Sequence, residues 1–356
     1  MKILIVISNM FGGGAQRVVS RLANALSEDN DVLIMTFPTE RMYPLSDKIR
    51  VYPFHEPTNT ILDIFGQGRP GFIKGFKRRY TYVKQLKMIM RRERPDVTIS
   101  FLDNPNFLNA MAGGCGIKIM SERNNPKYKG KRYFLRECFS FFFADKVVFQ
   151  TNTIKNMFPF WIRRKGVVIP NPVHVSCAAI GGRKKIVTMG RIHPQKNHVL
   201  LIRAFSEFVK IHPSYTLHIY GKYDLGDNLE EIVEKMGLAG KVFLEGFRDD
   251  VHEAISDAEQ FVLSSEYEGT PNALLEAMMM GLPCISTDFE GAREMMGGCD
   301  ACLLTPVGDV KALLEAMCRF ADNELLRKEY ARRGTEFAQV FSEDKVLPQW
   351  RGLFCQ

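Results

Sequence analysis

The sequence predicts an α/β protein with two domains, each built on a parallel β-sheet that helices cover on both faces. Short apolar runs alternate with segments of helical periodicity along the whole chain, and this alternation is typical of parallel sheets. The length of 356 residues exceeds the roughly 100–200 residues of one ordinary domain. Because ligands of such sheets bind at the carboxyl ends of the strands, a cleft between the two domains is the expected site.

Each half of the chain is expected to contribute six strands. In the first half the apolar runs are residues 2–7, 32–37, 96–101, 117–120, 146–149 and 167–169. In the second half they are residues 186–189, 216–220, 242–244, 260–263, 283–286 and 301–304. Helical segments between them include residues 15–28, 197–210, 229–236, 271–280 and 310–320. This order predicts one doubly wound sheet in each domain.

The boundary between the domains is expected at Ile169-Pro170-Asn171-Pro172-Val173, because two prolines interrupt regular structure there. The N-terminal domain would then comprise residues 1–172 and the C-terminal domain residues 173–340. Residues 341–356 carry apolar side chains at helical spacing, namely Val346, Leu347, Trp350 and Phe354. We expect this segment to form a helix that packs back onto the body of the protein, on the N-terminal domain.

Composition excludes several classes of protein. Hydrophobic residues make up 46% of the chain and charged residues 25%, which excludes wholesale disorder. No apolar run approaches the roughly 18–20 residues that a membrane-spanning helix needs. Eight cysteines in a chain of this length do not indicate a disulfide-rich scaffold, so reduced thiols are expected.

Positive charge is concentrated in the first half of the chain. Residues 1–180 contain 28 Lys and Arg against 13 Asp and Glu, a net charge of +15. Residues 181–356 contain 20 against 27, a net charge of −7. This asymmetry predicts an anionic partner for the first half, such as a phosphate compound, a membrane surface or a nucleic acid. No recognisable nucleic-acid-binding motif supports the last of these, so no nucleic-acid partner is expected.

A glycine run, Gly12-Gly13-Gly14, joins the first expected strand to the first expected helix. Glycines in such a turn allow backbone N–H groups to approach a phosphate at the helix N-terminus. The dinucleotide pattern G-x-G-x-x-G is incomplete, because Arg17 stands where the third glycine belongs. No acidic residue ends the second strand near Phe37 to bind a ribose, so an NAD-dependent enzyme is disfavoured. A plain tight turn is the alternative interpretation.

Two basic residues, Arg191 and Lys196, lie on the loop after the first strand of the second half, with Pro194 between them. An arginine and a lysine on one loop suit a diphosphate, because Arg offers a planar pair of donors and Lys a point charge. Solvated surface cations are the alternative.

The most specific pattern is found in residues 264–276, S-S-E-Y-E-G-T-P-N-A-L-L-E. Thr270 is expected to cap a helix that begins at Pro271, so that free N–H groups at the helix start can meet an anion. Glu268 precedes this helix and Glu276 lies about two turns inside it, which excludes an acid–base pair at contact distance. The two carboxylates are expected to bind different hydroxyls of one extended ligand, and surface carboxylates on a capped helix are the alternative.

The spacing Glu268-x7-Glu276 within S-x-x-E-G-x-P-N-x-x-L-E-A-M-x-x-G-x-P resembles the retaining nucleotide-sugar glycosyltransferases of family 4. The match extends in the right order to Gly12-Gly13-Gly14-Ala15, Ile169-Pro170-Asn171-Pro172 and Gly190-Arg191…Lys196-Asn197, and so covers most of the chain. The resemblance implies the GT-B fold, in which two Rossmann-like domains face each other across a cleft. It also implies that the N-terminal domain meets the acceptor and the membrane, and that the C-terminal domain binds the nucleotide-sugar.

The resemblance further implies roles for individual residues. Arg191 and Lys196 would hold the diphosphate and stabilise the departing nucleotide, and Glu268 would contact the transferred sugar. Glu276 would bind the ribose hydroxyls. Further donor contacts would come from loop positions of the two domains, namely Gly13, Gly14, Gly269, Thr270, Pro271 and Asn272. Members of the family generally need no metal ion, so neither a metal nor another cofactor is expected beside the UDP-sugar donor.

One position departs from the family pattern. In Ser121-Glu122-Arg123-Asn124-Asn125-Pro126, Arg123 stands where many relatives carry a histidine. Arginine does not relay a proton at neutral pH, but it can anchor a phosphate or a sugar hydroxyl. Asp103 and Glu122 are the other candidates for acid–base work in this domain.

Residues 69–94 form a basic segment with ten Lys or Arg against one acid, Glu93, and with aromatic residues interleaved. A helix of this composition suits the anionic surface of a membrane. It also suits the diphosphate of a polyprenyl-linked glycan, which similar bacterial enzymes extend. The residues singled out for this contact are Lys77, Arg78, Arg79 and Lys84. A solvated helix face is the alternative.

The expected activity is transfer of a hexose or N-acetylhexosamine from a UDP-sugar to an acceptor hydroxyl, with retention of configuration. The favoured acceptor is a polyprenyl-diphosphate-linked glycan of bacterial capsule, O-antigen or glycoprotein glycan synthesis. The expected location is the cytoplasm, at the inner face of the cell membrane. A nucleotide-sugar epimerase on the same fold and a non-catalytic nucleotide- or lipid-binding module are the alternatives, and residues 265–272 lack the acid–base groups that an epimerase needs.

Overall fold

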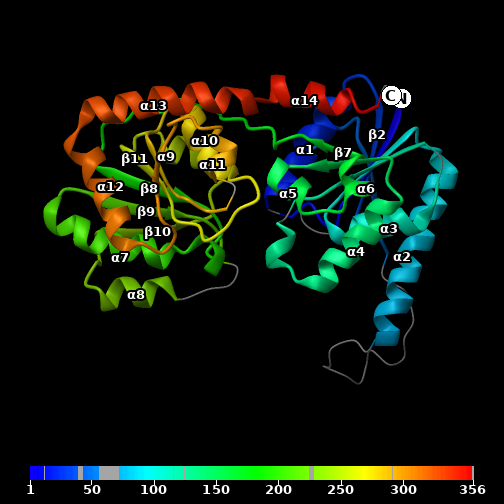
Figure 1. Ribbon diagram of the computed structural model, residues 1–356, viewed down its shortest axis with the longest axis horizontal. Coiled ribbons are helices and arrows are strands. Elements are labelled where there is room, and N and C mark those ends of the chain that lie inside the picture. The colour runs from blue at the N-terminus through cyan, green and yellow to red at the C-terminus, as the bar shows by residue number, and fades with distance from the viewer. Residues whose placement is uncertain are drawn as a thin grey trace. The chain divides into compact units, whose positions relative to one another are not determined.

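The computed structural model describes residues 1–11, 13–38, 43–55, 72–114, 116–123, 125–223, 228–290 and 292–354, and of residues 72–77 only the helical backbone. The chain forms two compact units (Figure 1). Unit 1 comprises Met1–Pro170 and Val346–Gln356, and unit 2 comprises Asn171–Lys345. The division falls inside the Pro170-Asn171-Pro172 segment, whose prolines cannot continue a helix or a central strand.

Unit 1 is built on a parallel sheet with the strand order β3-β2-β1-β4-β5-β6-β7. Its strands are β1 Lys2–Val6, β2 Asp31–Thr36, β3 Arg50–Pro53, β4 Val97–Phe101, β5 Ile117–Ser121, β6 Lys146–Phe149 and β7 Gly166–Val168. The expectation of six strands in this half was wrong, because it omitted β3. This strand pairs only with β2, at the edge of the sheet, and its four residues are partly or fully exposed. An edge strand of this kind has no apolar run to reveal it.

Alternate residues of the central strand β1 reach opposite faces of the first sheet, as the pleat of a strand requires. Ile3 and Ile5 pack with α1 and the C-terminal segment, whereas Leu4 and Val6 pack with α2 and α3. Both faces are therefore covered, and the strand is apolar throughout. The helices of this unit are α1 Gly14–Leu26, α2 Phe72–Glu93, α3 Asp103–Ala112, η2 Pro126–Tyr128, α4 Lys131–Phe142, α5 Asn152–Asn156 and α6 Phe160–Arg163.

The last helix, α14 Glu343–Arg351, carries the chain back to unit 1. Val346 and Trp350 are fully buried in the core between the sheet and α1. The Trp350 ring lies 5.6 Å from the ring of Phe101 on β4, and Arg351 Nη2 donates a hydrogen bond to the Ala25 carbonyl oxygen at 2.9 Å. The expectation that the C-terminal helix packs back onto the body is thus confirmed.

Unit 2 is built on a second parallel sheet, with the order β10-β9-β8-β11-β12-β13. Its strands are β8 Lys185–Met189, β9 Thr216–Tyr220, β10 Val242–Gly246, β11 Gln260–Leu263, β12 Cys284–Thr287 and β13 Leu303–Thr305. The sequence predicted all six. In both sheets the strand order reverses beside the first strand of the unit, which is the doubly wound arrangement.

Helices cover both faces of the second sheet (Figure 1). One face packs with α7 and α12 through Phe205, Phe208 and Phe320, and the other packs with α10 through Leu274 and Met278. The helices of this unit are η3 Pro194–Lys196, α7 His198–Ile211, α8 Leu229–Lys235, α9 Val251–Ile255, α10 Asn272–Met280, α11 Ala292–Met296, α12 Val310–Asp322, α13 Glu324–Ala338 and η4 Gln339–Phe341. The predicted α/β class with two doubly wound sheets is confirmed.

Candidate active site

Two loops of unit 2 touch each other through their backbones at the carboxyl end of the sheet. These are the loop after β8, which begins at Gly190, and the loop after β9, which begins at Gly221. A Cβ atom on Gly221 would lie 1.8 Å from the carbonyl oxygen of Gly190. Only glycine fits there, and the close contact fixes the start of the loop that carries Arg191 and Lys196.

Lys196 and Glu268 form an ion pair at this end of the sheet. Lys196 lies on η3 after β8, and Glu268 lies on the loop after the neighbouring strand β11. Lys196 Nζ is 2.6 Å from Glu268 Oε1, and the exposed fractions of the two side chains are only 16% and 8%. Ser265 Oγ donates a second hydrogen bond to the same carboxylate oxygen at 2.7 Å. The family resemblance implies that both residues bind the nucleotide-sugar donor. In this structure the two side chains pair with each other.

Further hydrogen bonds hold the two loops together. The N–H of Glu266 donates to the carbonyl oxygen of Gln195 at 2.8 Å, and Gln195 Nε2 donates to the carbonyl oxygen of Tyr267 at 2.8 Å. Ser264 Oγ donates to the carbonyl oxygen of Lys196 at 2.9 Å. These bonds connect backbone to backbone and side chain to backbone, so the pair of Lys196 and Glu268 rests on a fixed frame.

Helix α10 begins one residue later than predicted, and its capping was predicted wrongly. Pro271 occupies the N-cap position and Asn272 is the first helical residue, whereas Thr270 was expected to cap the helix. Among the described residues, the buried Thr270 hydroxyl has no hydrogen-bond partner. The proline sets the backbone of this turn, and the carbonyl oxygens of Thr270 and Pro271 accept from the N–H groups of Asn272 and Leu275 instead. Gly269 and Thr270 are half-buried beside Glu268.

Asn272 joins the start of α10 to the first residue of unit 2. Asn171 Nδ2 donates to Asn272 Oδ1 at 2.8 Å, across 101 residues of sequence. The resemblance to family 4 includes both the Ile169-Pro170-Asn171-Pro172 segment and the segment with Asn272. Their side chains are in contact, which accounts physically for the two motifs occurring together.

Glu276 has a histidine partner that the sequence did not reveal. The Glu276 side chain is buried on α10, and its Oε2 lies 3.3 Å from Nε2 of His252 on α9. The backbone N–H of Ser176 donates to His252 Nδ1 at 3.3 Å. Because Nδ1 accepts this bond, the proton of a neutral ring lies on Nε2 and is donated to Glu276. His252 thus holds the carboxylate in one orientation.

Arg191 lies immediately after Gly190 and is exposed at the same end of the sheet. In unit 2 the structure therefore brings Arg191, Lys196, Glu268 and the start of α10 to the loops after β8 and β11. These strands are neighbours in the sheet, and this adjacency brings together residues about 70 positions apart in sequence.

In unit 1, Gly13 lies between β1 and α1, and Gly14 begins α1. Gly13 has a φ of 145°, and its Cβ would lie 2.5 Å from Oε1 of Gln16, so another residue would be strained there. The Gly13 N–H donates to the Tyr43 hydroxyl at 3.3 Å. Gly12 lies outside the described residues.

Glu122 and Arg123 follow β5, and both are buried. The two Glu122 oxygens accept hydrogen bonds from the Tyr133 hydroxyl at 3.1 and 3.2 Å, and Oε1 also accepts from the Arg123 N–H at 2.8 Å. The Arg123 guanidinium lies 5.3 Å from the ring centre of Phe101 and 5.4 Å from that of Trp350. Burial lowers the pKa of Arg123 to about 9, and the Glu122 charge opposes this shift.

Glu137 on α4 is a second buried carboxyl group in this region and was not predicted. Asn106 Nδ2 donates to Glu137 Oε2 at 3.3 Å. Burial and the nearby Glu122 carboxylate raise the pKa of Glu137 well above its usual range. Glu122 is likewise closed off from solvent in this structure.

Asp103 is the first residue of α3 and pairs with Arg136 of α4. The ion pair joins two helices on the same side of the first sheet. A carboxylate with an arginine partner is a poor general base, because the cation stabilises its charged form. The position favours a structural role for Asp103 over the acid–base role considered from the sequence.

The basic segment forms the helix α2 as predicted, with a buried and an exposed side. Tyr82, Leu86, Ile89 and Met90 are buried against the sheet. Arg78, Arg79 and Lys84 are exposed, and the side chain of Lys77 lies outside the described residues. Among the described residues, no helix combines the length and apolar character needed to cross a bilayer.

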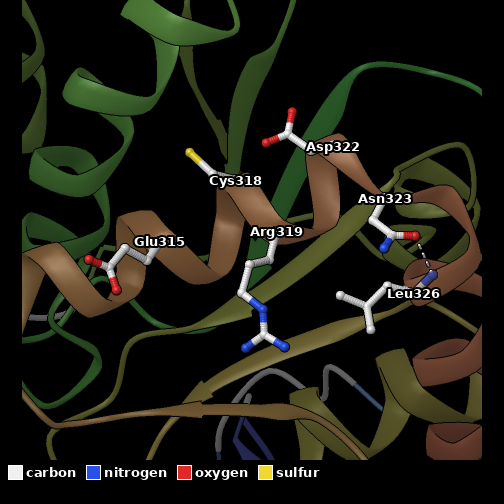
Figure 2. Close-up of a pocket in the computed structure, with 6 residues that line it drawn as sticks. All are labelled: Glu315, Cys318, Arg319, Asp322, Asn323 and Leu326. Atoms are coloured by element: carbon white, nitrogen blue, oxygen red, sulfur yellow. Dashed lines mark hydrogen bonds between the residues drawn. The ribbon is translucent and has the colours of Figure 1, made fainter.

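Two further features of the described residues concern possible metal ligands and a surface pocket. Within the described part of the chain, no three His, Cys, Asp or Glu side chains converge as metal ligands would. A shallow pocket lies where α12 ends and α13 begins, lined by Glu315, Cys318, Arg319, Asp322, Asn323 and Leu326 (Figure 2). Asn323 Oδ1 accepts from the Leu326 N–H at 2.9 Å and so caps α13. No predicted site residue lines this pocket.

Two family profiles match the chain, one in each half. The profile described as "Glycosyltransferase Family 4" matches residues 12–176, and the profile described as "Glycosyl transferases group 1" matches residues 183–323. Together they include Gly13, Gly14 and Arg123 in unit 1, and Arg191, Lys196, Glu268 and Glu276 in unit 2.

Curated relatives match over nearly the whole chain. An α-1,4-N-acetyl-D-galactosaminyltransferase of Campylobacter jejuni, named for GalNAc-α-(1→4)-GalNAc-α-(1→3)-diNAcBac-PP-undecaprenol, is 27% identical over 100% of this chain and 99% of its own length. A second Campylobacter jejuni enzyme, N-acetylgalactosamine-N,N'-diacetylbacillosaminyl-diphospho-undecaprenol 4-α-N-acetylgalactosaminyltransferase, is 25% identical over 97% of both chains.

Solved structures share the fold. Anabaena HepE in complex with UDP and glucose superposes with a TM-score of 0.81 at 16% identity, over 99% of both chains. Sucrose-phosphate synthase of Thermosynechococcus elongatus superposes with a TM-score of 0.80 at 18% identity, over 99% of this chain and 98% of that one. At these identities the likeness bears on the fold, which is the GT-B fold of glycosyltransferases.

Proposed function

Because the chain belongs to the family 4 glycosyltransferases, with a group 1 domain in its second half, we propose that it transfers a sugar from a UDP-sugar to an acceptor hydroxyl with retention of configuration. The sugar is a hexose or an N-acetylhexosamine, and the new linkage is α. The N-acetylgalactosamine named in both Campylobacter jejuni relatives supports an N-acetylhexosamine donor. The UDP in the HepE complex supports the nucleotide.

The observation that carries this proposal is the buried ion pair of Lys196 and Glu268 beside the exposed Arg191. An ammonium group and a carboxylate that are 2.6 Å apart form two adjacent binding groups of opposite charge. The cation suits a diphosphate and the anion suits sugar hydroxyls, so one ligand with both parts satisfies them together. A nucleoside-diphosphate sugar is such a ligand.

In the proposed reaction, the bond between the anomeric carbon and the diphosphate oxygen breaks while the acceptor oxygen bonds to that carbon on the same face. The acceptor proton passes to the departing phosphate oxygen, so UDP leaves and no protein base is needed. Arg191 and Lys196 stabilise the charge that develops on the diphosphate. Glu268, released from Lys196 by the diphosphate, accepts hydrogen bonds from the transferred sugar, and Glu276 accepts them from the ribose.

Remaining donor contacts are assigned to the backbone and loop positions Gly13, Gly14, Gly269, Thr270, Pro271 and Asn272. The buried Thr270 hydroxyl supports this assignment, because among the described residues no protein group bonds to it. Arg123 is proposed to hold the geometry of the loop after β5, and Glu122 to fix its backbone. We propose that the reaction needs no metal ion, since cationic side chains supply the charge that a metal would provide.

The proposed acceptor is a polyprenyl-diphosphate-linked glycan at the cytoplasmic face of the membrane, met by unit 1. The names of the two Campylobacter jejuni relatives, both of which contain an undecaprenol diphosphate, support this class. The net charge of +15 in residues 1–180 and the exposed cations of α2 suit an anionic lipid acceptor. The proposed context is bacterial capsule, O-antigen or glycoprotein glycan synthesis.

A panel of UDP-sugars tests the donor. The expected result is that one UDP-sugar raises the melting temperature most and is slowly hydrolysed to UDP in the absence of acceptor. Lys196→Ala and Glu268→Ala should each remove the UDP release, whereas Lys210→Ala, at an exposed lysine of the same unit, should retain it. Undiminished UDP release in both site variants would show that the active site lies elsewhere.

A further inference from the structure

Unit 1 exposes a group of aromatic side chains at the end of α4 and on α6. This aromatic patch consists of Phe139, Phe142, Phe143, Phe160 and Trp161. The exposed fractions are 62% for Phe142, 65% for Phe160 and 43% for Trp161. Ring centres of Phe142 and Trp161 are 6.0 Å apart, and that of Phe143 is 5.3 Å from both Phe142 and Phe139.

These residues are not needed to fill the core. Phe141, on the opposite side of α4, packs with Phe149 and Phe158, and all three are buried. Along α4 the exposed residues Leu135, Phe139 and Phe143 follow each other at intervals of four, which is one face of a helix. Single exposed apolar residues are ordinary, but a contiguous group on one helix face indicates an interaction surface.

Positive charge surrounds the aromatic patch. Residues 127–165 contain ten Lys and Arg against two acids, Glu137 and Asp145, and Glu137 is buried. Lys165 Nζ lies 5.9 Å from the ring centre of Phe142, and the Arg164 guanidinium lies 5.8 Å from that of Phe160. Cations next to exposed aromatic rings are the arrangement found where proteins enter the headgroup layer of a bilayer.

The patch is also continuous with the basic helix α2. The Arg79 guanidinium of α2 lies 5.9 Å from the ring centre of Phe107 on α3. Phe107 in turn lies 6.1 Å from Phe139 on α4. An unbroken series of contacts therefore connects the cations of α2 with the aromatic rings of α4 and α6.

We propose that the aromatic patch inserts into the headgroup region of an anionic bilayer, while the exposed Arg163 and Arg164 bind lipid phosphates beside it. The inference rests on the proposed lipid-linked acceptor, and it extends the membrane-facing surface from α2 to α4 and α6. Anionic lipid is favoured over a second copy of the chain, because a twofold contact would bring the same cationic surfaces together. Aromatic rings and long basic side chains both bury apolar parts while their polar ends stay in the headgroup layer.

Tryptophan fluorescence tests the insertion directly. The chain has two tryptophans, of which Trp350 is fully buried and Trp161 is in the patch. Vesicles of phosphatidylcholine and phosphatidylglycerol should shift the emission of Trp161 to shorter wavelength and protect it from acrylamide. Vesicles of phosphatidylcholine alone should do so much less, and Trp161→Phe should remove the change. If the protein sediments with the mixed vesicles while Trp161 stays fully accessible to acrylamide, the insertion surface is not this patch.

A variant with Phe142, Phe160 and Trp161 all changed to Ser tests the contribution to binding. Sedimentation with the mixed vesicles should weaken by roughly tenfold or more. Leu325→Ser, at a 79% exposed leucine of unit 2, is the matched control and should bind like the unchanged protein. Unchanged binding of the triple variant would show that another surface binds the vesicles. Protection of Trp161 from acrylamide at raised protein concentration without lipid would show that the patch mediates self-association instead.

Donor binding separates this inference from the proposed function. The triple variant should show the same thermal stabilisation by the preferred UDP-sugar as the unchanged protein, since the three residues belong to unit 1 and are not among the proposed donor contacts. If Trp161 inserts into vesicles but no UDP-sugar binds, the membrane role of the patch stands and the transferase proposal is refuted. If a UDP-sugar binds but Trp161 does not insert into vesicles, only the membrane role of the patch is refuted.

Discussion

Lys196 and Glu268 form an ion pair in this structure and have a catalytic role in our proposal, so substitutions should affect both stability and transfer. Lys196→Ala removes the cation and leaves the Glu268 carboxylate, with an 8% exposed side chain, bonded among the described residues to the neutral Ser265 and Gln195. We expect a loss of up to about 3 kcal/mol in the free energy of unfolding. Transfer activity should fall by about 100- to 1000-fold, because charge on the leaving diphosphate loses a stabilising group. Urea unfolding and UDP release measure the two effects.

A second substitution separates the two effects. Glu268→Gln in the Lys196→Ala chain should recover much of the stability, because a neutral amide needs no cation, while transfer remains lost. Lys210→Ala removes an exposed pair with Glu207 and should change stability by less than about 0.5 kcal/mol. Recovery of transfer together with stability would contradict a catalytic role for Lys196.

Trp350 and Trp161 provide a matched pair of tryptophans in unit 1. Trp350 is fully buried and flanks both Phe101 and Arg123, so Trp350→Ala should cost about 3–5 kcal/mol in the free energy of unfolding. Trp161→Ala should leave that free energy nearly unchanged, because the side chain is 43% exposed. Urea unfolding followed by circular dichroism measures both. Equal free energies of unfolding for the two variants would mean that the packing of α14 contributes little to the stability of unit 1.

Candidate site residues could be named from the sequence where a motif is local, whereas their distant partners in the structure could not. Glu268, Glu276 and Lys196 stand in recognisable patterns of consecutive residues. His252 meets Glu276 across 24 residues and from a different helix, so no spacing rule connects them. Glu137 and Tyr133 lie on one side of α4 and meet Glu122 only because α4 packs near the end of β5.

At the scale of elements, buried segments were predictable and exposed ones less so. The strands that are apolar on both faces, such as β1 and β4, were found within one or two residues of their ends. The edge strand β3 has half-exposed residues and no apolar run, so its pairing with β2 decides its conformation. The start of α10 was predicted one residue early, because Pro271 fits a cap position as well as a first turn.

The cations of α2 lead to a prediction about membrane binding. Changing Lys77, Arg78, Arg79 and Lys84 to Gln should weaken sedimentation with phosphatidylglycerol-containing vesicles, and the effect should be largest at low salt. The buried residues of α2 are untouched, so circular dichroism should show an intact helix. A control with the exposed Lys235, Lys311, Lys328 and Arg332 of unit 2 changed to Gln should bind normally. Unchanged binding at low salt would refute a membrane role for α2.

Glu93 anchors the end of α2 and makes a pH-dependent contribution to stability. Burial opposes its charge, but hydrogen bonds from Lys2, Tyr52 and Arg92 lower the pKa of Glu93 to about 2. Its contribution is therefore complete above the ordinary pKa of 4.5 and is lost as the pH falls towards 2. Glu93→Gln should destabilise unit 1 by about 1 kcal/mol at neutral pH, and the difference should shrink below pH 4.5. A difference that is constant with pH would exclude the charge as its cause.

At the scale of the whole molecule, charge and motifs assign different ligands to the two units. Unit 2 binds the donor in our proposal although residues 181–356 carry a net charge of −7, so Arg191 and Lys196 act as local cations in an acidic surrounding. The surplus of +15 in residues 1–180 is then available to the lipid acceptor. Donor binding should accordingly depend weakly on salt, and membrane binding strongly.

Hydrogen exchange in the presence of UDP tests this division between the units. A ligand present at 100 times its dissociation constant stabilises the state that binds it by about 2.7 kcal/mol, which slows exchange about 100-fold in segments that open only by unfolding of unit 2. We expect this protection in the strands β8 and β11 and at the start of α10, with little change in the strands β1 and β4. Lys196→Ala should abolish it. Protection confined to unit 1 would mean that the nucleotide binds to the basic unit. The positive charge of that unit would then serve to bind the donor instead of the acceptor.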